Sequence, residues 1–149
     1  MTCNCITMPP PATLAKGDSI AEAIVKLQQY ALPALPVVDA KGHFLGIFGH
    51  REVIGLVLPR AARAGDALQD LSFVGDTVDE LRKRLGSVLT EQVGRYMAPH
   101  RTVRPETSLV EALLLLYRGD AVLAVCDPAG ILVGFATAAD AANCLKGDA

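Results

Sequence analysis

Gly134-Phe135-Ala136-Thr137-Ala138-Ala139-Asp140 has a counterpart 88 positions earlier, Gly46-Ile47-Phe48-Gly49-His50-Arg51-Glu52, which begins with the same glycine and also ends in an acid. Upstream of both stretches the correspondence continues at offsets of 88 and 89. Eleven residues recur in the same order, in the first half Met8, Pro10, Thr13, Ser19, Glu22, Ala23, Leu27, Val37, Asp39, Gly42 and Gly46. We interpret the chain as an internal duplication, with chance similarity as the alternative.

Each copy predicts a short extended segment, Thr13-Leu14 or Thr102-Val103, followed by a helix. Ser19 and Ser108 each stand three residues before a glutamate, which is the spacing of a capping box. Behind these serines apolar residues recur at helical spacing, namely Ile20, Ala23, Ile24 and Leu27, and Leu109, Ala112, Leu113 and Leu116. We therefore expect each helix to bury one face.

Two short apolar runs separated by a turn follow in each copy and predict β-hairpins. They are Leu35 to Val38 and Phe44 to Phe48, and Val122 to Cys126 and Leu132 to Ala136. A closing helix is expected to bury Val53, Ile54 and Val57 in one copy and Ala141, Ala142 and Leu145 in the other. The unit is thus β-α-β-β-α.

An α+β fold follows, because one such unit would leave a sheet face wet unless the two copies pack sheet to sheet about a pseudo-twofold axis. We place the repeats at 6–59 and 96–146, with a helical linker at 60–95. In that linker Thr77 and Glu80 have capping spacing before a helical pattern that reaches Val93, which Gly86 and Gly94 would weaken or interrupt. Ligands would bind in the cleft between the copies.

Composition excludes several classes of function. The 149 residues are 51% hydrophobic and 20% charged, with a net charge of −2. Trp is absent and aromatics are 5%, so we expect no nucleic-acid partner. No apolar run approaches the roughly 20 residues of a membrane span, and the N-terminus lacks a secretory pattern, so we expect a cytoplasmic protein with its four cysteines as thiols.

The doubled unit resembles the cystathionine β-synthase (CBS) domain pair from about Ile6 to Leu145. The resemblance rests on a Met-x-x-x-x-Thr-Val/Leu start, on Pro36 to Asp39, and most specifically on Gly134 to Asp140. It implies a regulatory module that binds AMP, ADP or ATP, or S-adenosylmethionine or NAD, between the repeats. It also implies a disk-like homodimer.

The second copy carries the main candidate site. Thr137 and the amides of Ala138 and Ala139 would form a phosphate seat at a helix start, and Asp140 could accept both ribose hydroxyls. Phe135, with the backbone near Thr102 and Val103, would sandwich adenine. Thr137 and Asp140 also have the spacing of a simple helix cap, which is the alternative interpretation.

The first copy offers a second, altered site of Thr13, Leu14, Ile47, His50 and Glu52. Here a glycine replaces the hydroxyl residue and glutamate replaces aspartate, so this site is altered or empty. His50 and Arg51 would contact phosphate, or they would be solvent-exposed residues at a helix start.

Positive charge gathers beside the second copy's first strand. Arg101 and Arg104 would pair with phosphates if they face the cleft, which would favour a phosphorylated ligand. A solvated loop is the alternative, and it is favoured for Arg95.

No catalytic motif is visible, so we predict no enzyme, no required cofactor and no metal site. Cys3 and Cys5 could ligate a metal, but no second ligand pair lies nearby, and a disordered tail is the preferred interpretation. The leading hypothesis is a nucleotide-binding regulator that signals through an effector protein or through self-association. The alternatives are an assembly module with empty sites and a small nucleotide-processing enzyme.

Overall fold

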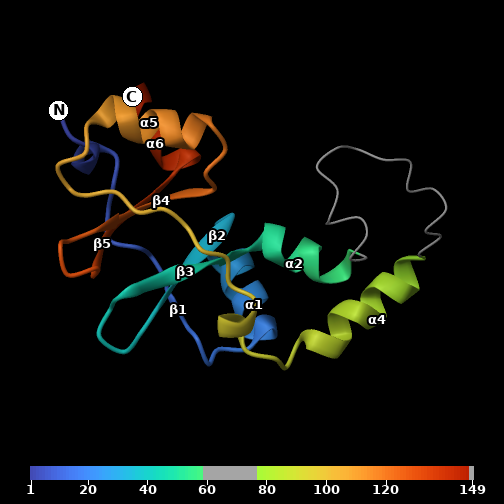
Figure 1. Ribbon diagram of the computed structural model, residues 1–149. Coiled ribbons are helices and arrows are strands. Elements are labelled where there is room, and N and C mark those ends of the chain that lie inside the picture. The colour runs from blue at the N-terminus through green and yellow to red at the C-terminus, as the bar shows by residue number, and fades with distance from the viewer. Residues whose placement is uncertain (59–76, 148–149) are drawn as a thin grey trace.

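The computed structural model describes residues 1–58 and 77–147 and contains the two predicted β-α-β-β-α repeats (Figure 1). The first repeat consists of β1 (Leu14–Ala15), α1 (Ile20–Tyr30), β2 (Ala34–Val38), β3 (Phe44–Gly49) and α2 (His50–Val57). The second consists of a bridge at Val103, α5 (Leu109–Tyr117), β4 (Val122–Cys126), β5 (Leu132–Thr137) and α6 (Ala138–Lys146). The fold is α+β, as predicted.

The two repeats pair their strands at equivalent positions, although the first strand of the second repeat is reduced to a single bridge. In the first, β1 runs parallel to β2 with Leu14 opposite Val37, and in the second Val103 forms the equivalent parallel bridge to Val125. Both hairpins are antiparallel, and their ends pair Ala34 with Gly49 and Val122 with Thr137. These matched positions confirm the duplication.

The serine half of each predicted capping box is present at the two first helices. The hydroxyl of Ser19 accepts a hydrogen bond from the Glu22 amide at 3.1 Å, and that of Ser108 accepts one from the Glu111 amide at 3.2 Å. Each cap satisfies one amide that the helix cannot pair internally. Behind the caps, each helix packs small and branched apolar side chains against the core, and Ala23 is one of these buried residues.

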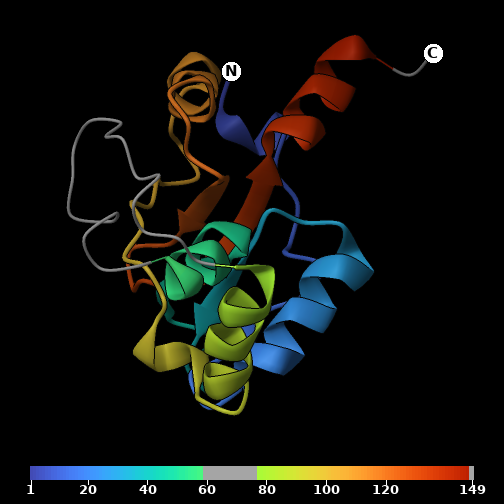
Figure 2. The same cartoon turned by 90° about the vertical axis from the view of Figure 1, so that its right-hand side faces the viewer.

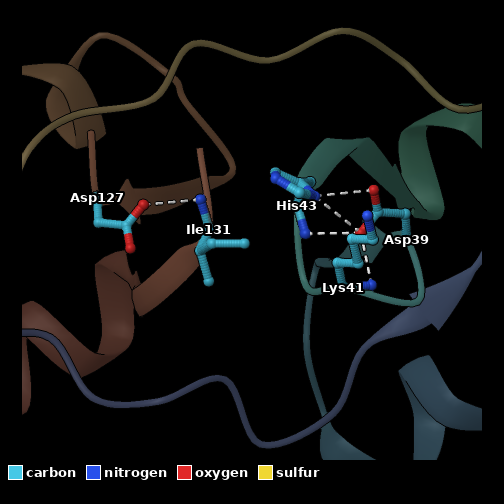
Figure 3. A network of polar contacts seen from close by, with 5 residues as sticks. All are labelled: Asp39, Lys41, His43, Asp127 and Ile131. Carbon is cyan, nitrogen blue, oxygen red and sulfur yellow. Dashed lines mark hydrogen bonds and ion pairs between the residues drawn. The ribbon is translucent and has the colours of Figure 1, made fainter. Parts of the chain in front are cut away.

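The two hairpin turns also match each other (Figure 3). Asp39 accepts from the amides of Lys41 and His43 at 2.9 and 2.8 Å, and Asp127 accepts from those of Ala129 and Ile131 at 2.9 and 3.0 Å. Carboxylates that close a turn in this way hold the register of the strands on either side.

The turns join the repeats across the pseudo-twofold axis. The Phe44 amide donates to the Gly130 carbonyl and the Leu132 amide donates to the Gly42 carbonyl, both at 3.0 Å. Both glycines have positive φ, +90° and +85°, which side-chain-bearing residues rarely adopt. Beside the turns, buried residues from both repeats form a shared core of Ala34, Ile47, Val122 and Phe135.

The segment preceding each repeat packs on the other repeat. The short helix η1 (Cys3–Cys5) lies on the second repeat, where the Cys3 amide donates to the Thr107 carbonyl at 2.8 Å. Its counterpart η3 (Val93–Arg95) lies on the first, where the Val93 amide donates to the Asp18 carbonyl at 2.9 Å. The expectation of a disordered tail at Cys3 to Cys5 is therefore wrong, because the Cys3 side chain is 0% exposed within the second repeat's core.

The linker helix α4 (Val78–Val88) begins at Thr77, whose hydroxyl accepts from the Glu80 amide as predicted. Gly86 lies within the helix and does not interrupt it, whereas Val93 belongs to the separate η3. α4 packs against α2, and Arg84 donates to the Val57 carbonyl at 2.8 Å. The part of the predicted linker from 60 to 76 lies outside the described residues.

The closing helices α2 and α6 bury fewer of their apolar side chains than the sequence pattern predicts. Ile54 on α2 is 57% exposed, Leu145 on α6 is 58% exposed and Ala142 on α6 is also exposed, so these three core predictions are wrong. Each helix touches its repeat along one narrow stripe, and on α6 only Ala141 is buried. Figure 2 shows α6 extending away from the sheets. Within residues 1–58 and 77–147, no helix is long and apolar enough to cross a membrane.

Candidate functional site

The start of α6 is built by a reciprocal cap. The Thr137 hydroxyl accepts from the Asp140 amide at 3.1 Å, and the Thr137 amide donates to Asp140 Oδ2 at 2.9 Å. The helix-cap interpretation of this pair is therefore correct, and it leaves the second carboxylate oxygen of Asp140 outside the cap. Ala138 and Ala139 are exposed, and their amides precede the first turn of internal hydrogen bonds. This helix start can therefore receive an anion.

The start of α2 differs because the chain is crowded there. The Gly49 amide donates to Glu52 Oε1 at 3.0 Å, and the His50 amide donates to the Pro33 carbonyl at 3.1 Å. A Cβ on Gly49 would lie 2.3 Å from the Pro33 oxygen, so no hydroxyl-bearing side chain fits at this position. Compared with the start of α6, the start of α2 lacks the capping hydroxyl. Its first helical amide, that of His50, is already hydrogen-bonded to the Pro33 carbonyl.

The residues on the second repeat's first strand divide between two ends of the sheet. Arg101 Nε lies 3.1 Å from Asp120 Oδ2, just before β4 and at the end where Val122 pairs with Thr137. Arg104 lies at the opposite, hairpin end. The two arginines predicted as one phosphate cluster are thus separated, and Arg101 lies at the same end of the sheet as the α6 start.

Thr102 and Arg104 line a small cavity of about 180 Å³ between the repeats. Its other walls come from β3, the end of β4 and the second hairpin turn, namely Phe44, Cys126, Asp127, Pro128 and Gly130. Val103 uses its own amide and carbonyl to bond Ala124 and Cys126, both at 2.9 Å. Only the side chain of Val103 therefore remains for a ligand.

Several predicted site residues belong to the core. Phe135 is 1% exposed in the core shared by the repeats, so its ring has no open face on which to stack an adenine. Leu14 and Ile47 are also buried, at 0% and 7% exposure. The Thr13 carbonyl accepts from Lys26 Nζ at 3.1 Å. Of the predicted second site, His50 and Glu52 lie at the start of α2, and Thr13 is half-buried.

A larger cavity of about 700 Å³ lies beside α2. It is lined by Arg51, Glu52, Ile54, Gly55, Leu56, Leu58 and Tyr96. Sequence reasoning missed Tyr96, because only the tertiary fold brings the segment before the second repeat against the first. The Tyr96 hydroxyl donates to the Glu91 carboxylate, and this hydrogen bond is the main reason that the pKa of Tyr96 lies above its ordinary value.

No group of three or more His, Cys, Asp or Glu side chains suited to a metal ion occurs in the part of the chain that the structure describes. Cys3, one of the two residues considered as ligands, lies in the core, where burial raises the pKa of its thiol. That environment opposes the thiolate that a metal requires.

Comparison with solved structures returns proteins of the same fold. CBSX2 from Arabidopsis thaliana is 24% identical, with a TM-score of 0.71 over 99% of this chain and 98% of that chain. A crystal structure of CBSX2 in complex with AMP is 23% identical, with a TM-score of 0.69 over 97% and 96%. The GK1048 protein from Geobacillus kaustophilus is 20% identical, with a TM-score of 0.70 over 98% and 96%. A search of curated protein sequences finds no match.

The comparison with family models identifies the repeat itself. The CBS domain model matches the chain twice, at residues 4–59 and 93–147. Both matches extend into the segment that precedes each repeat and packs on the opposite repeat in the fold. The chain therefore belongs to the CBS-domain family and carries two copies of the CBS domain.

Proposed function

We propose that this CBS pair is a regulatory module that binds an adenosine nucleotide of the AMP, ADP or ATP class at the start of α6. The observation that carries the proposal is the Thr137–Asp140 cap, which orders the helix start while leaving one Asp140 carboxylate oxygen and the amides of two exposed residues, Ala138 and Ala139, outside the cap. The crystal structure of the similar protein CBSX2 with AMP supports this class of ligand. S-adenosylmethionine and NAD share the adenosine and belong to the same test.

Two kinds of protein group would bind two parts of the ligand: backbone amides would bind the phosphate, and a carboxylate would bind the ribose. The amides of Ala138 and Ala139, with the positive end of the helix dipole, favour a phosphate. Asp140 accepts from a ribose hydroxyl. Arg101, at the same end of the sheet, adds positive charge once its contact with Asp120 is exchanged for phosphate. Thr102 and the side chain of Val103 would then contact the rest of the ligand, whereas Arg104, predicted for the same site, lies at the hairpin end of the sheet.

Calorimetric titration with AMP, ADP, ATP, S-adenosylmethionine and NAD tests the site, with Asp140→Asn as the main variant. The amide oxygen of asparagine keeps the hydrogen bond from the Thr137 amide, so the helix start survives while the charge is lost. We expect binding to weaken at least about tenfold, as for a lost hydrogen bond to a charged group. Glu111→Gln is the matched control, because Glu111 occupies the same capped position on α5.

Unchanged binding in Asp140→Asn would move the site elsewhere, and Glu52→Gln would then test the cavity beside α2. The regulatory proposal also requires that bound ATP is not turned over. Phosphate or pyrophosphate release during incubation with ATP would instead identify a nucleotide-processing enzyme.

An assembly module is the second candidate. It is favoured by Gly49, whose crowded position has removed the capping hydroxyl from the first repeat's helix start. In that case none of the five ligands would bind, and sedimentation would show a homodimer regardless of ligand. As a regulator, the chain would instead signal to an effector protein or through ligand-dependent self-association.

A further inference from the structure

Two exposed cysteines from opposite ends of the chain lie together where α6 meets the N-terminal segment. The Cys144 thiol of α6 donates to the backbone carbonyl of Cys5, with 2.9 Å between sulfur and oxygen. Cys5 directs its own thiol to the Thr2 carbonyl at 3.2 Å. Both cysteines are free and exposed, although 138 residues separate them in the sequence.

Standard bond lengths limit the distance between the two backbones. With the sulfur of Cys144 2.9 Å from the Cys5 oxygen, the two Cα atoms are at most roughly 8 Å apart. A disulfide needs about 4.4 to 6.8 Å between Cα atoms. A small shift of α6, which buries only Ala141, would bring the two Cα atoms into that range, and rotation of the two exposed side chains would then bring the sulfur atoms together.

We propose that Cys5 and Cys144 form a reversible intramolecular disulfide that fastens α6 to the N-terminal segment. A small-molecule disulfide of the oxidised glutathione class is the oxidant. The Cys144 or Cys5 thiolate attacks it, one glutathione leaves as the thiol, and the second cysteine then displaces the other glutathione from the mixed disulfide. Two protein thiols are oxidised, one glutathione disulfide is reduced to two thiols, and both protons pass to the released glutathione.

The other two cysteines are protected from this reaction by their surroundings. Cys3 lies in the second repeat's core, and Cys126 is buried at the end of β4. Burial is the main cause that raises the pKa of each of these two thiols, so each has less thiolate at neutral pH. Exposure and proximity therefore both select Cys5 and Cys144.

The disulfide would act on the candidate site through the helix. Cys144 stands one turn beyond Asp140 on α6, so a link at Cys144 restrains the helix whose first turn carries Thr137 and Asp140. The disulfide itself does not depend on nucleotide binding.

The test is incubation of the reduced full chain with oxidised glutathione, followed by non-reducing tryptic digestion and mass spectrometry. The peptides Met1–Lys16 and Gly119–Lys146 each hold one buried and one exposed cysteine, so the linkage is assigned in a Cys3→Ala/Cys126→Ala variant. Circular dichroism checks that this variant is folded. We expect these two peptides to be joined in monomeric protein and to separate on reduction. We also expect the disulfide to raise the Tm of the oxidised protein above that of the reduced protein.

Cys5→Ser and Cys144→Ser must each abolish both the link and the rise in Tm. The wild-type chain is oxidised and digested in parallel, so the proposal can still be tested if a variant misfolds. The proposal is overturned if wild-type protein yields only glutathione adducts, only links between chains, no reaction, or a link that requires Cys3 or Cys126.

Discussion

At the scale of single residues, the crowding around Gly49 separates the two repeats. Gly49 and Thr137 occupy equivalent positions, at the end of β3 and of β5. The Pro33 carbonyl and Ala34 approach Gly49 so closely that a Cβ would lie 2.3 Å from the Pro33 oxygen. The missing hydroxyl of the first repeat is thus a consequence of packing.

Gly49→Ala should lower the free energy of unfolding by about 1 to 3 kcal/mol, as for an overpacked core, because the nearest atoms belong to backbone. Gly55→Ala on the neighbouring helix is the matched control. An added Cβ there meets nothing within 4 Å, so that substitution should stabilise by roughly 0.5 to 1 kcal/mol. Urea unfolding measures both, and equal effects of the two variants would contradict the crowding argument.

At the scale of elements, short polar patterns placed the helix starts and turns because their partners lie within four residues. Ser19, Thr77 and Ser108 each accept from the amide three positions on. Asp39 closes its hairpin turn in the same local way. Such interactions need no tertiary context, so a sequence pattern predicts them directly.

The Asp39 turn should make stability depend on pH. Hydrogen bonds from backbone amides, first that of His43, lower the pKa of Asp39 in the folded protein. Its carboxylate therefore contributes stability that is present above the ordinary aspartate pKa and is lost as the pH falls through the lowered value. In Asp39→Asn the charge is absent at every pH. The stability difference between wild type and variant should thus shrink from neutral pH to about pH 3 in urea unfolding, and a constant difference would refute this.

At the scale of the whole molecule, the two repeats share a core and exchange their leading segments. Phe135 packs between the repeats, and its amide and carbonyl both bond Met8 from the N-terminal segment. Neither repeat is complete without chain from the other half. The molecule should therefore unfold as one cooperative unit.

Phe135→Ala should cost about 3 to 5 kcal/mol, as for a large buried aromatic. Val133→Ala, two residues earlier on the same strand and half-exposed, should change stability by much less. Hydrogen exchange should show that Phe135→Ala lowers protection in β2 and β3 as well as in β4 and β5. Loss confined to the second repeat would show that the repeats fold independently.

The duplication, the order of elements, the caps and the hairpin turns could be predicted from the sequence, because each rests on local hydrogen bonds or on a short apolar period. The tertiary structure alone decided that Phe135 and Leu14 are core residues, that Arg101 and Arg104 lie at opposite ends of a sheet, and that Tyr96 joins a cavity beside α2. It also placed Cys5 beside Cys144. The physical reason is that burial and proximity between distant segments depend on how the two halves pack together, which a one-dimensional pattern does not record.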